Sequence, residues 1–351
     1  MQFIVPLIVV IATLIAGLAI FMLLGVDPQI AFKAYFIEPL SSVYGISEWL
    51  LKALPLCLIG LGLAVAYRAQ VWNIGAEGQL VMGGIFATAV MVYAQNSITS
   101  GALVVLMILA GIVGGMVWAG LAAWMRTQFN ANEILTTLML VYVAQSLLQY
   151  LLVGTVDNTA PLQDPMGAGF PQSQMFPAHA TLPLLGQWLP ALETTRLHVG
   201  VLLILLAVPL MWLFVKRSFI GFQMTVAGLA PKAANYAGFK TNRLIWLALL
   251  ISGGLAGLAG ALEVAGPVGQ LQESWRPGYG FTAIIVAFLG RLHPIGVLLG
   301  ALLMALLTLG GEALQISMSL PQSVSMLFQG LLLLFLLSAD VLVNYRIVWK
   351  K

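Results

Sequence analysis

Charged residues are scarce in this sequence. Lysine, arginine, aspartate and glutamate make up 8% of its 351 residues, whereas about 25% is usual for a soluble domain. Hydrophobic residues make up 61%, and the mean hydropathy is +1.00. This composition excludes a soluble globular protein and predicts an all-α protein that crosses a lipid bilayer many times. The formal net charge of +3 is too small to suggest binding to nucleic acid.

Residues that bind metals or perform catalysis are also scarce. The single cysteine, Cys57, cannot form an intramolecular disulfide, and the three histidines, His179, His198 and His293, are far apart in the sequence. There is no G-x-x-x-x-G-K-[ST] phosphate loop and no G-x-S-x-G nucleophile elbow. We therefore expect no metal site, no cofactor bound by this chain and no catalytic residues. The protein is predicted not to be an enzyme.

Apolar segments occur at ten places, and we expect each of them to be helical. Most are close to the roughly 20 residues that a helix needs to cross the hydrocarbon. Segment 279–290 is shorter and would cross only as part of a broken or re-entrant element. The first segment has no basic leader, so we interpret it as a retained helix and not as a signal peptide. The ten segments are 3–25, 49–67, 72–93, 102–124, 133–153, 198–215, 243–262, 279–290, 294–311 and 323–343.

The basic residues predict how these segments are oriented. Ten crossings that start in the cytoplasm put eleven basic residues on the cytoplasmic side and four on the other, so both termini are predicted to be cytoplasmic. Without 279–290 as a crossing, the numbers become seven against eight and the asymmetry is lost. The eleven are Arg68, Arg126, Lys216, Arg217, Lys232, Lys240, Arg243, Arg291, Arg346, Lys350 and Lys351, and the four are Lys33, Lys52, Arg196 and Arg276.

Two long loops interrupt the predicted single transmembrane domain, 1–351. The external loop, 154–197, is rich in proline and could either dock a soluble partner or serve as a simple connector. The cytoplasmic loop, 216–242, contains a short amphipathic helix by prediction. Pro231 suits its first turn and Gly238 suits its end. Such a helix at the cytoplasmic face could lie in a groove of a partner protein.

Polar side chains inside an apolar segment are the strongest indication of a functional site. An ionised side chain at membrane depth costs about 2.5–3.5 kcal/mol on insertion scales, and Glu77 lies within segment 72–93 beside three glycines that allow a helix break. Two roles are therefore considered for Glu77: it makes a structural hydrogen bond, or it lines a pathway for a substrate. Asn132 and Glu133 could cap a helix or lie near a cytoplasmic gate. The candidates for the pathway are Trp72, Asn73, Glu77, Gln79, Asn132 and Glu133.

Four segments of this chain, in order, resemble one family. Asn73-Ile74-Gly75-Ala76-Glu77-Gly78-Gln79 is similar to the signature of permease subunits of ATP-binding-cassette (ABC) importers for nucleosides, within the wider family for simple sugars and branched-chain amino acids. Segments 131–140, 233–239 and 278–290 match as well. The resemblance implies a type II importer fold of about ten transmembrane helices in a bacterial inner membrane. It also implies a coupling helix that inserts into the ATPase, formed by Ala230, Pro231, Lys232, Ala233, Ala234, Asn235, Tyr236, Ala237 and Gly238.

The same resemblance implies partners and a mechanism. The partners would be a cytoplasmic ATPase that uses ATP, an extracytoplasmic binding protein, and a second permease subunit, with a paralogue favoured over a second copy. Transport would proceed by alternating access. Nucleosides are the expected substrate, and a simple sugar such as ribose is the nearest alternative. An ion-coupled secondary transporter is an alternative of another class, and a membrane scaffold is a third that leaves Glu77 without a reason.

Overall fold

The structure is a computed structural model that describes residues 4–154, 160–167, 169–275, 278–321 and 323–344. Helices dominate the described part of the chain, where the β-structure consists of two isolated bridges, Gln172 with Gln272 and Leu184 with His198. The elements are α1 (Ile4–Leu23), α2 (Pro28–Phe32), η1 (Lys33–Ile37), η2 (Glu38–Leu40), α3 (Val43–Arg68), α4 (Ala76–Ala94), α5 (Ala102–Phe129), α6 (Glu133–Leu152), η3 (Ala178–Ala180), η4 (Leu185–Gln187), η5 (Pro190–Leu192), η6 (Val199–Val201), α7 (Leu202–Arg217), α8 (Phe219–Leu229), α9 (Pro231–Tyr236), α10 (Thr241–Glu263), η7 (Val264–Val268), α11 (Tyr279–Leu289), α12 (Pro294–Met318) and α13 (Ser323–Asn344).

Each of the ten predicted segments coincides with one of these helices, namely α1, α3, α4, α5, α6, α7, α10, α11, α12 and α13. Among the described residues, seven helices are long and apolar enough to cross a membrane. The predicted fold, an all-α polytopic membrane protein, is therefore confirmed. Several boundaries differ from the prediction. Helix α3 begins at Val43, before the predicted residue 49, because the Ser42 hydroxyl accepts a hydrogen bond from the amide of Gly45 at 3.0 Å and caps the helix.

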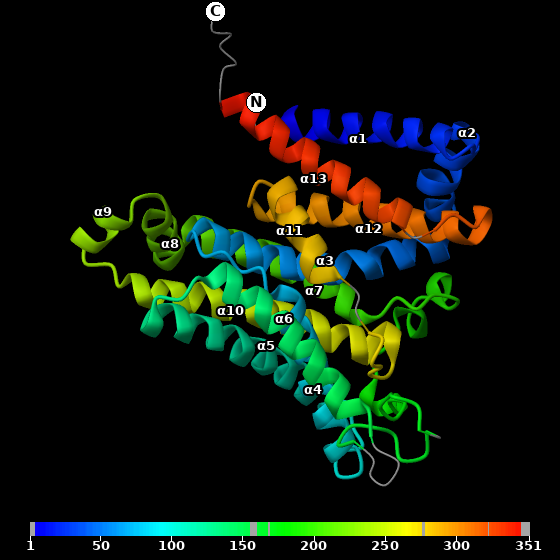
Figure 1. The fold of residues 1–351 in the computed structure, drawn as a ribbon. Coiled ribbons are helices and arrows are strands. Elements are labelled where there is room, and N and C mark those ends of the chain that lie inside the picture. Colours follow the sequence, from blue (N-terminus) through cyan, green and yellow to red (C-terminus); the bar gives the residue numbers. More distant parts are fainter. Residues whose placement is uncertain (1–3, 155–159, 168, 276–277, 322, 345–351) are drawn as a thin grey trace, which may run out of the picture.

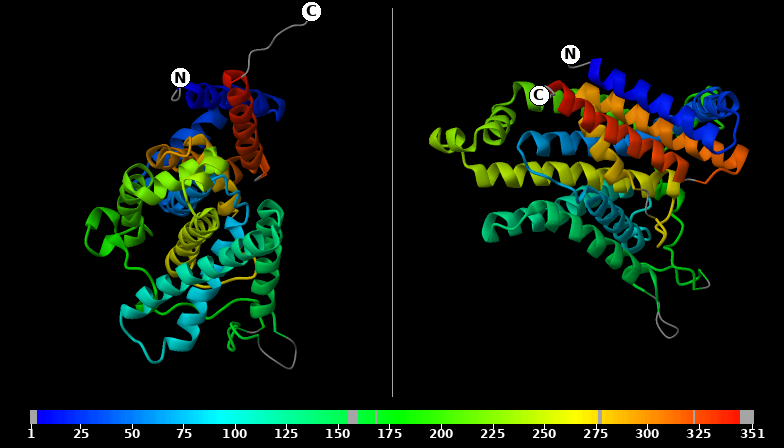
Figure 2. Two further views of the ribbon diagram at one scale, coloured as in Figure 1. Left: turned by 90° about the vertical axis from the view of Figure 1, so that its left-hand side faces the viewer. Right: turned by 45° about the horizontal axis from the view of Figure 1, so that its top comes forward.

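Helix α3 lies at the centre of the molecule (Figure 1). Every residue from 53 to 67 on α3 is buried, which explains why this helix is apolar all round. Helix α10 packs between α3 and α5, and α12 packs on another side of α3. The antiparallel pair α1 and α13 lies outside α12, while α8 and α9 extend from one end of the bundle (Figure 1 and Figure 2).

Small residues set the close approach of α4, α5 and α10. A Cβ atom on Gly257 of α10 would overlap the backbone of Gly111, and one on Gly115 of α5 would overlap the backbone of Gly253. Gly83 of α4 faces Gly257 in the same way. These small residues therefore serve helix packing, because any side chain there would push two backbones apart.

Polar contacts join residues that the predicted topology places on the same side of the membrane. Lys52 pairs with Glu312 at 2.8 Å, and Arg196 pairs with Glu48, all four on the predicted external side. Arg126 pairs with Glu133 at 2.8 Å on the predicted cytoplasmic side. These contacts agree with the predicted grouping of the loops. Arg276, Arg346, Lys350 and Lys351 of that topology lie outside the described residues.

The described part of the external loop packs against the segment between α10 and α11. The amides of Ser173 and Phe176 donate to the carbonyls of Leu271 and Gly269, each at 2.8 Å. The amide of Leu182 donates to the carbonyl of Ala265 at 2.8 Å. The loop therefore covers one end of this segment. Whether it docks a soluble partner or serves as a connector stays a prediction.

Helix α11 is too short to cross the bilayer alone. Its 11 residues rise about 17 Å, against a hydrocarbon thickness of about 30 Å. The chain before it reaches the external loop at Leu271, and the turn after it receives a hydrogen bond from Arg68, whose Nε donates to the Leu292 carbonyl at 3.0 Å. Helix α11 therefore has the short length that the sequence predicts for a broken or re-entrant element at 279–290. Its crossing of the bilayer stays a prediction.

A methyl group at Gly257 is expected to destabilise the bundle. G257A places a Cβ against the Gly111 carbonyl, and we expect a loss of about 1–3 kcal/mol in the free energy of unfolding, typical of overpacking. The melting temperature of the purified protein in detergent measures this effect. G120A is the matched control on α5, because a Cβ there would meet its nearest neighbour at 3.6 Å. If G257A has the same melting temperature as the wild type, the conclusion that α10 packs closely on α5 is wrong.

Candidate functional site

The chain is not helical between α3 and α4, and this break carries the first polar cluster. Asn73 is fully buried there. Its Nδ2 donates to Gln79 Oε1 at 2.8 Å and to Ser252 Oγ at 2.9 Å, while its Oδ1 accepts from the Gly75 amide at 3.0 Å and from Gln79 Nε2 at 3.1 Å. The two amide side chains thus satisfy each other and attach the break to α10.

Glu77 forms the second cluster, at the start of α4. Its side chain is buried, with the whole residue 1% exposed. One carboxylate oxygen accepts from the Gly278 amide at 2.9 Å and the other from the Gly280 amide at 2.6 Å. These amides lie at the N-terminus of α11, where helix donors have no internal partner and the helix dipole favours a negative charge. Glu77 therefore caps α11 from a different helix.

The two glycines that Glu77 binds are both required by the backbone. Gly278 has a φ of +71°, in the left-handed region that favours glycine. A Cβ atom on Gly280 would overlap the backbone of Glu77. The sequence Gly278-Tyr279-Gly280 thus allows α11 to begin directly against α4.

Trp72, Asn132 and Glu133 lie at the cytoplasmic end of the same break. Asn132 caps α6, since its Oδ1 accepts from the Ile134 amide at 2.9 Å. Glu133 Oε1 pairs with Arg126 at 2.8 Å and lies 3.5 Å from the Trp72 amide nitrogen. The Trp72 ring packs with the rings of Tyr67 and Phe288.

The structure thus brings five of the six predicted pathway residues together around one break, with Asn132 at its edge. Their polar atoms bind other parts of this chain: Asn73 and Gln79 bind each other, Glu77 binds α11, and Glu133 binds Arg126. These contacts give each residue a structural task. A contact of any of the six with substrate stays a prediction.

A third polar cluster, in the outer half of the bundle, was not singled out in the sequence. It consists of Glu48 and Lys52 of α3, Glu263 of α10, Tyr279 of α11 and Glu312 of α12, with Arg196 from the external loop. The sequence held one hint, because Glu263 ends an otherwise uncharged run of small and apolar residues. Its neighbours come from segments far apart in the chain, and no local pattern predicts them.

The predicted coupling residues form one exposed surface at the end of the bundle that the predicted topology places in the cytoplasm. Helix α9 begins at Pro231, and Gly238, with a φ of +78°, follows its end, as the sequence predicts. Among the nine residues from Ala230 to Gly238, all but Ala234 are exposed, and Tyr236 is 97% exposed. A fully exposed aromatic ring beside a buried anchor is typical of a surface that binds a partner.

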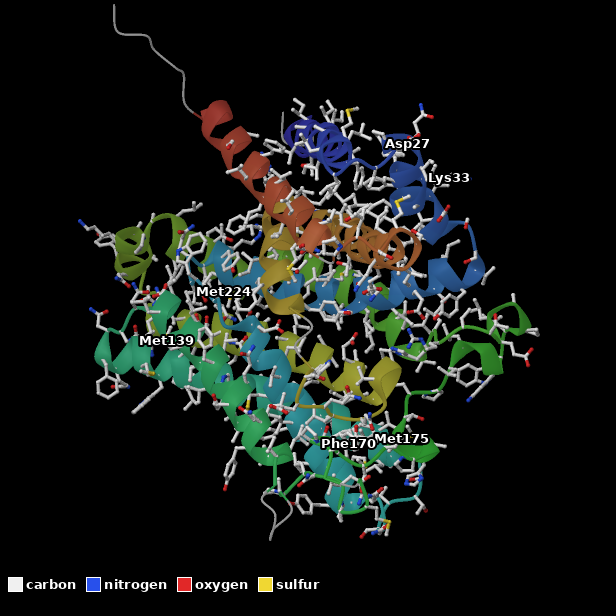
Figure 3. The ribbon with its side chains drawn as sticks, turned by 45° about the vertical axis from the view of Figure 1, so that its right-hand side comes forward. Asp27, Lys33, Met139, Phe170, Met175 and Met224 are labelled. Carbon is white, nitrogen blue, oxygen red and sulfur yellow. The ribbon has the colours of Figure 1, made fainter. Side chains whose placement is uncertain are left out.

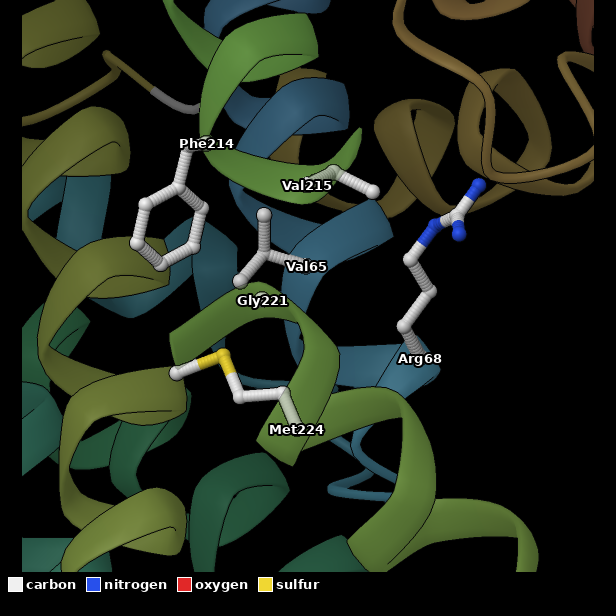
Figure 4. Close-up of a pocket in the computed structure, with 6 residues that line it drawn as sticks. All are labelled: Val65, Arg68, Phe214, Val215, Gly221 and Met224. Carbon is white, nitrogen blue, oxygen red and sulfur yellow. The ribbon is translucent and has the colours of Figure 1, made fainter. Parts of the chain in front are cut away.

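Helix α8 links this exposed surface to the core. Met224 and Gly221 of α8 line an apolar crevice with Val65 of α3 and Phe214 of α7, while Arg68 points away from its apolar side chains (Figure 4). A Cβ atom on Gly228 would overlap the Arg68 carbonyl. The two helices are thus in backbone contact, so a displacement of α8 would be transmitted to α3.

The turn between α11 and α12 completes the cytoplasmic end. Arg68 donates to the Leu292 carbonyl there at 3.0 Å. Burial, together with the positive charges of Lys216 and Arg68, lowers the pKa of His293 from its ordinary value. Both effects disfavour the charged form of His293 on this basic surface.

Comparisons with known proteins agree over most of the chain. Residues 45–337 match the family model described as "Branched-chain amino acid transport system / permease component". The chain is 38% identical over 346 residues to the glucose ABC transporter permease protein TsgB13 of Haloferax volcanii, covering 97% of this chain and 89% of that protein. It is 30% identical over 340 residues to the guanosine ABC transporter permease protein NupP of Bacillus subtilis, covering 95% and 93%. It is 27% identical over 314 residues to the nucleoside ABC transporter permease protein NupB of Lactococcus lactis, covering 88% and 84%. No solved structure matches significantly.

Replacing Glu77 with glutamine is expected to loosen α11. The substitution E77Q leaves one oxygen where two are used, so the second amide at the start of α11 loses its acceptor. We expect a loss of about 2 kcal/mol in the free energy of unfolding, since hydrogen bonds to charged groups contribute about 1.5–3 kcal/mol. Thermal melting of the purified variant measures it. E193Q, at an exposed position in the external loop, is the control and should melt with the wild type. Equal melting of E77Q would contradict the capping role.

Proposed function

The chain belongs to the branched-chain amino acid transport system / permease component family, and from this membership we propose that it carries a neutral, hydroxyl-bearing solute into the cell as the membrane subunit of an ATP-driven importer. A nucleoside is the first candidate for that solute. The names of two relatives, for guanosine and for nucleosides, support this choice. A simple sugar is the second candidate, supported by the relative that is named for glucose.

The charges of the outer cluster also suit a neutral solute. Its two basic side chains are already paired, Lys52 with Glu312 and Arg196 with Glu48. An anionic substrate would call for basic groups that are free to bind it. In the described part of this cluster each basic group is held by a carboxylate.

Alternating access would be driven from the cytoplasmic end. In this proposal a partner ATPase binds and hydrolyses ATP, and this chain binds no cofactor. The surface from Ala230 to Gly238 lies in a groove of that ATPase. When the ATPase closes, α9 and α8 move together, and the contacts of Gly228 and Met224 pass the movement to α3. Arg68 passes it to the turn that follows α11.

The polar break would then serve as the fixed part of the moving bundle. Trp72, Asn73, Glu77, Gln79, Asn132 and Glu133 remain our candidates for the inner end of the pathway, because they lie where α4, α6, α10 and α11 meet. A substrate that passes there would contact backbone N–H and C=O groups of the non-helical segment between α3 and α4.

The remaining partners are assigned by position. We propose that the external loop binds a substrate-binding protein. Phe170 and Met175 are 64% and 76% exposed on this loop, and Figure 3 shows them at the edge of the view that lies away from Asp27 and Lys33. The apolar outer faces of the helices contact lipid and a second permease subunit, a paralogue or a second copy. The distribution of basic residues supports cytoplasmic termini in a cytoplasmic membrane.

Reconstitution tests this function. Liposomes that contain the permease with its partner ATPase and binding protein should take up labelled nucleosides or glucose only when ATP is inside with the ATPase. An ion-coupled transporter would instead work without the ATPase and stop when an uncoupler is added. Uptake no greater than in empty vesicles, for every nucleoside and sugar supplied, would contradict the importer function.

The exposed ring of Tyr236 gives the coupling surface its own test. Y236A removes a side chain that is 97% exposed, so the fold should be unchanged. We expect ATP-driven uptake to fall about tenfold or more, as hot-spot aromatic residues contribute at least about 2 kcal/mol at interfaces. Uptake and ATP hydrolysis are measured in the same proteoliposomes. Y150A is the control, because Tyr150 is 71% exposed at the end of α6 that leads into the external loop. Unchanged uptake in Y236A would remove α9 from the coupling surface.

A further inference from the structure

The outer cluster contains one carboxylate that its neighbours do not satisfy. Arg196 binds Glu48 with two hydrogen bonds, Nε to Oε1 at 3.0 Å and Nη2 to Oε2 at 2.6 Å. Lys52 binds Glu312 at 2.8 Å. Glu263 lies among these pairs, and it interacts electrostatically with Lys52, Arg196 and Glu48. Each cation already has a carboxylate of its own, so Glu263 is the excess acid of the cluster.

Glu263 is buried and accepts no hydrogen bond from any described residue. It is 7% exposed, and the described part of the chain supplies no donor within hydrogen-bond distance of its carboxylate. A buried polar group without a hydrogen-bond partner destabilises a folded protein, and a charged group does so more strongly. Such a group in a native protein calls for an occupant, either water or a ligand.

Glu263 also lies at an irregular point of its helix. It is the last α-helical residue of α10, and a π-helical turn, η7, follows directly. Gly266 within this turn has a non-helical backbone (φ −110°, ψ −107°). Turns of this kind inside helices are frequent at functional sites.

Tyr279 contributes a second polar group without a partner. It is the first residue of α11, and its hydroxyl makes no hydrogen bond with any described residue. It interacts electrostatically with Glu263, Glu312, Glu77 and Glu48. An acceptor and a donor, both unused, therefore occur in one cluster at the start of a half-helix. Transport proteins place substrate sites at such interrupted helices.

We infer that Glu263 and Tyr279 form a subsite that binds the vicinal hydroxyl groups of a neutral solute. A carboxylate can accept hydrogen bonds from two neighbouring hydroxyls at once, and a phenol can donate to or accept from a third oxygen. Among the described residues of the cluster, carboxylates outnumber basic side chains by three to two, which disfavours anions. Ribose in a nucleoside and a free sugar both carry such hydroxyls. This subsite rests on the proposed function and specifies the chemistry that it recognises.

Uptake by the complete transporter in proteoliposomes tests the subsite. The variants are E263Q, Y279F and the control E273Q, whose side chain accepts a hydrogen bond from Gln149 at the external surface. The substrates are guanosine against 2′,3′-dideoxyguanosine, and glucose against 2-deoxyglucose. One binding protein serves all variants, so its own selectivity cancels when variants are compared. The substrate pair in which uptake of the hydroxylated member exceeds that of its deoxy analogue shows whether the hydroxyls belong to a nucleoside or to a free sugar.

We expect E263Q to lower uptake of the responding hydroxylated substrate about tenfold or more. The preference of the transporter for that substrate over its deoxy analogue should fall by the same factor. Y279F should show a smaller loss of the same kind, and E273Q should match the wild type. An equal loss for both members of a pair would mean a structural role and would overturn the subsite. Unchanged uptake in E263Q would overturn it as well.

A measurement without transport separates this inference from the proposed function. Millimolar guanosine or glucose should raise the melting temperature of the purified transporter, the deoxy analogue should raise it less, and E263Q should remove the difference. If the wild type shows this difference but no ATP-dependent uptake, the subsite stands and the importer function fails. If neither solute stabilises the wild type more than its analogue does, the subsite is wrong, even where uptake is observed.

Discussion

The carboxylate of Glu77 holds the interrupted part of this protein together. A helix that starts inside a bilayer exposes amide donors that neither water nor lipid can satisfy. Glu77 satisfies two of them, at Gly278 and Gly280, from the start of another helix. Those two donors and the dipole of α11 counteract part of the cost of burying its charge. Because the contact joins positions about 200 residues apart, it fixes α4 and α11 relative to each other.

The rest of the bundle is built around this joint. Asn73 and Gln79 attach the break to Ser252 of α10, and the facing glycines of α4, α5 and α10 let those helices pack backbone to backbone. On the cytoplasmic side, α8 packs on α3 and extends to the exposed ring of Tyr236. On the outer side the polar cluster is incompletely satisfied at Glu263. A rigid joint thus lies between the surface that we propose for the partner ATPase and the polar cluster that we propose to bind the solute.

The sequence predicts the helices well, because apolar length is a local property. Each of the ten segments contains a helix, and Pro231 and Gly238 mark α9 correctly. It also identifies Glu77 as unusual, because a charge in an apolar segment is visible locally. It cannot supply the partner of Glu77, since that contact is made by backbone amides, which every residue carries. Gly278-Tyr279-Gly280 enters the sequence analysis only as part of segment 278–290, which resembles the permease family, and not as the partner of Glu77. Glu263 was missed for a similar reason, since it is conspicuous only once its neighbours are seen to be paired with other residues.

Amide hydrogen exchange at the start of α11 tests the central claim most directly. In the complete transporter in lipid nanodiscs, the amides of Gly278 and Gly280 should exchange as slowly as those in the middle of α3, because the Glu77 carboxylate holds both of them. In E77Q at least one of the two should exchange much faster, while the amides of α5 keep their wild-type rates. Fast exchange of both amides in the wild type would show that α11 is not held by Glu77, and the account built on that joint would be wrong.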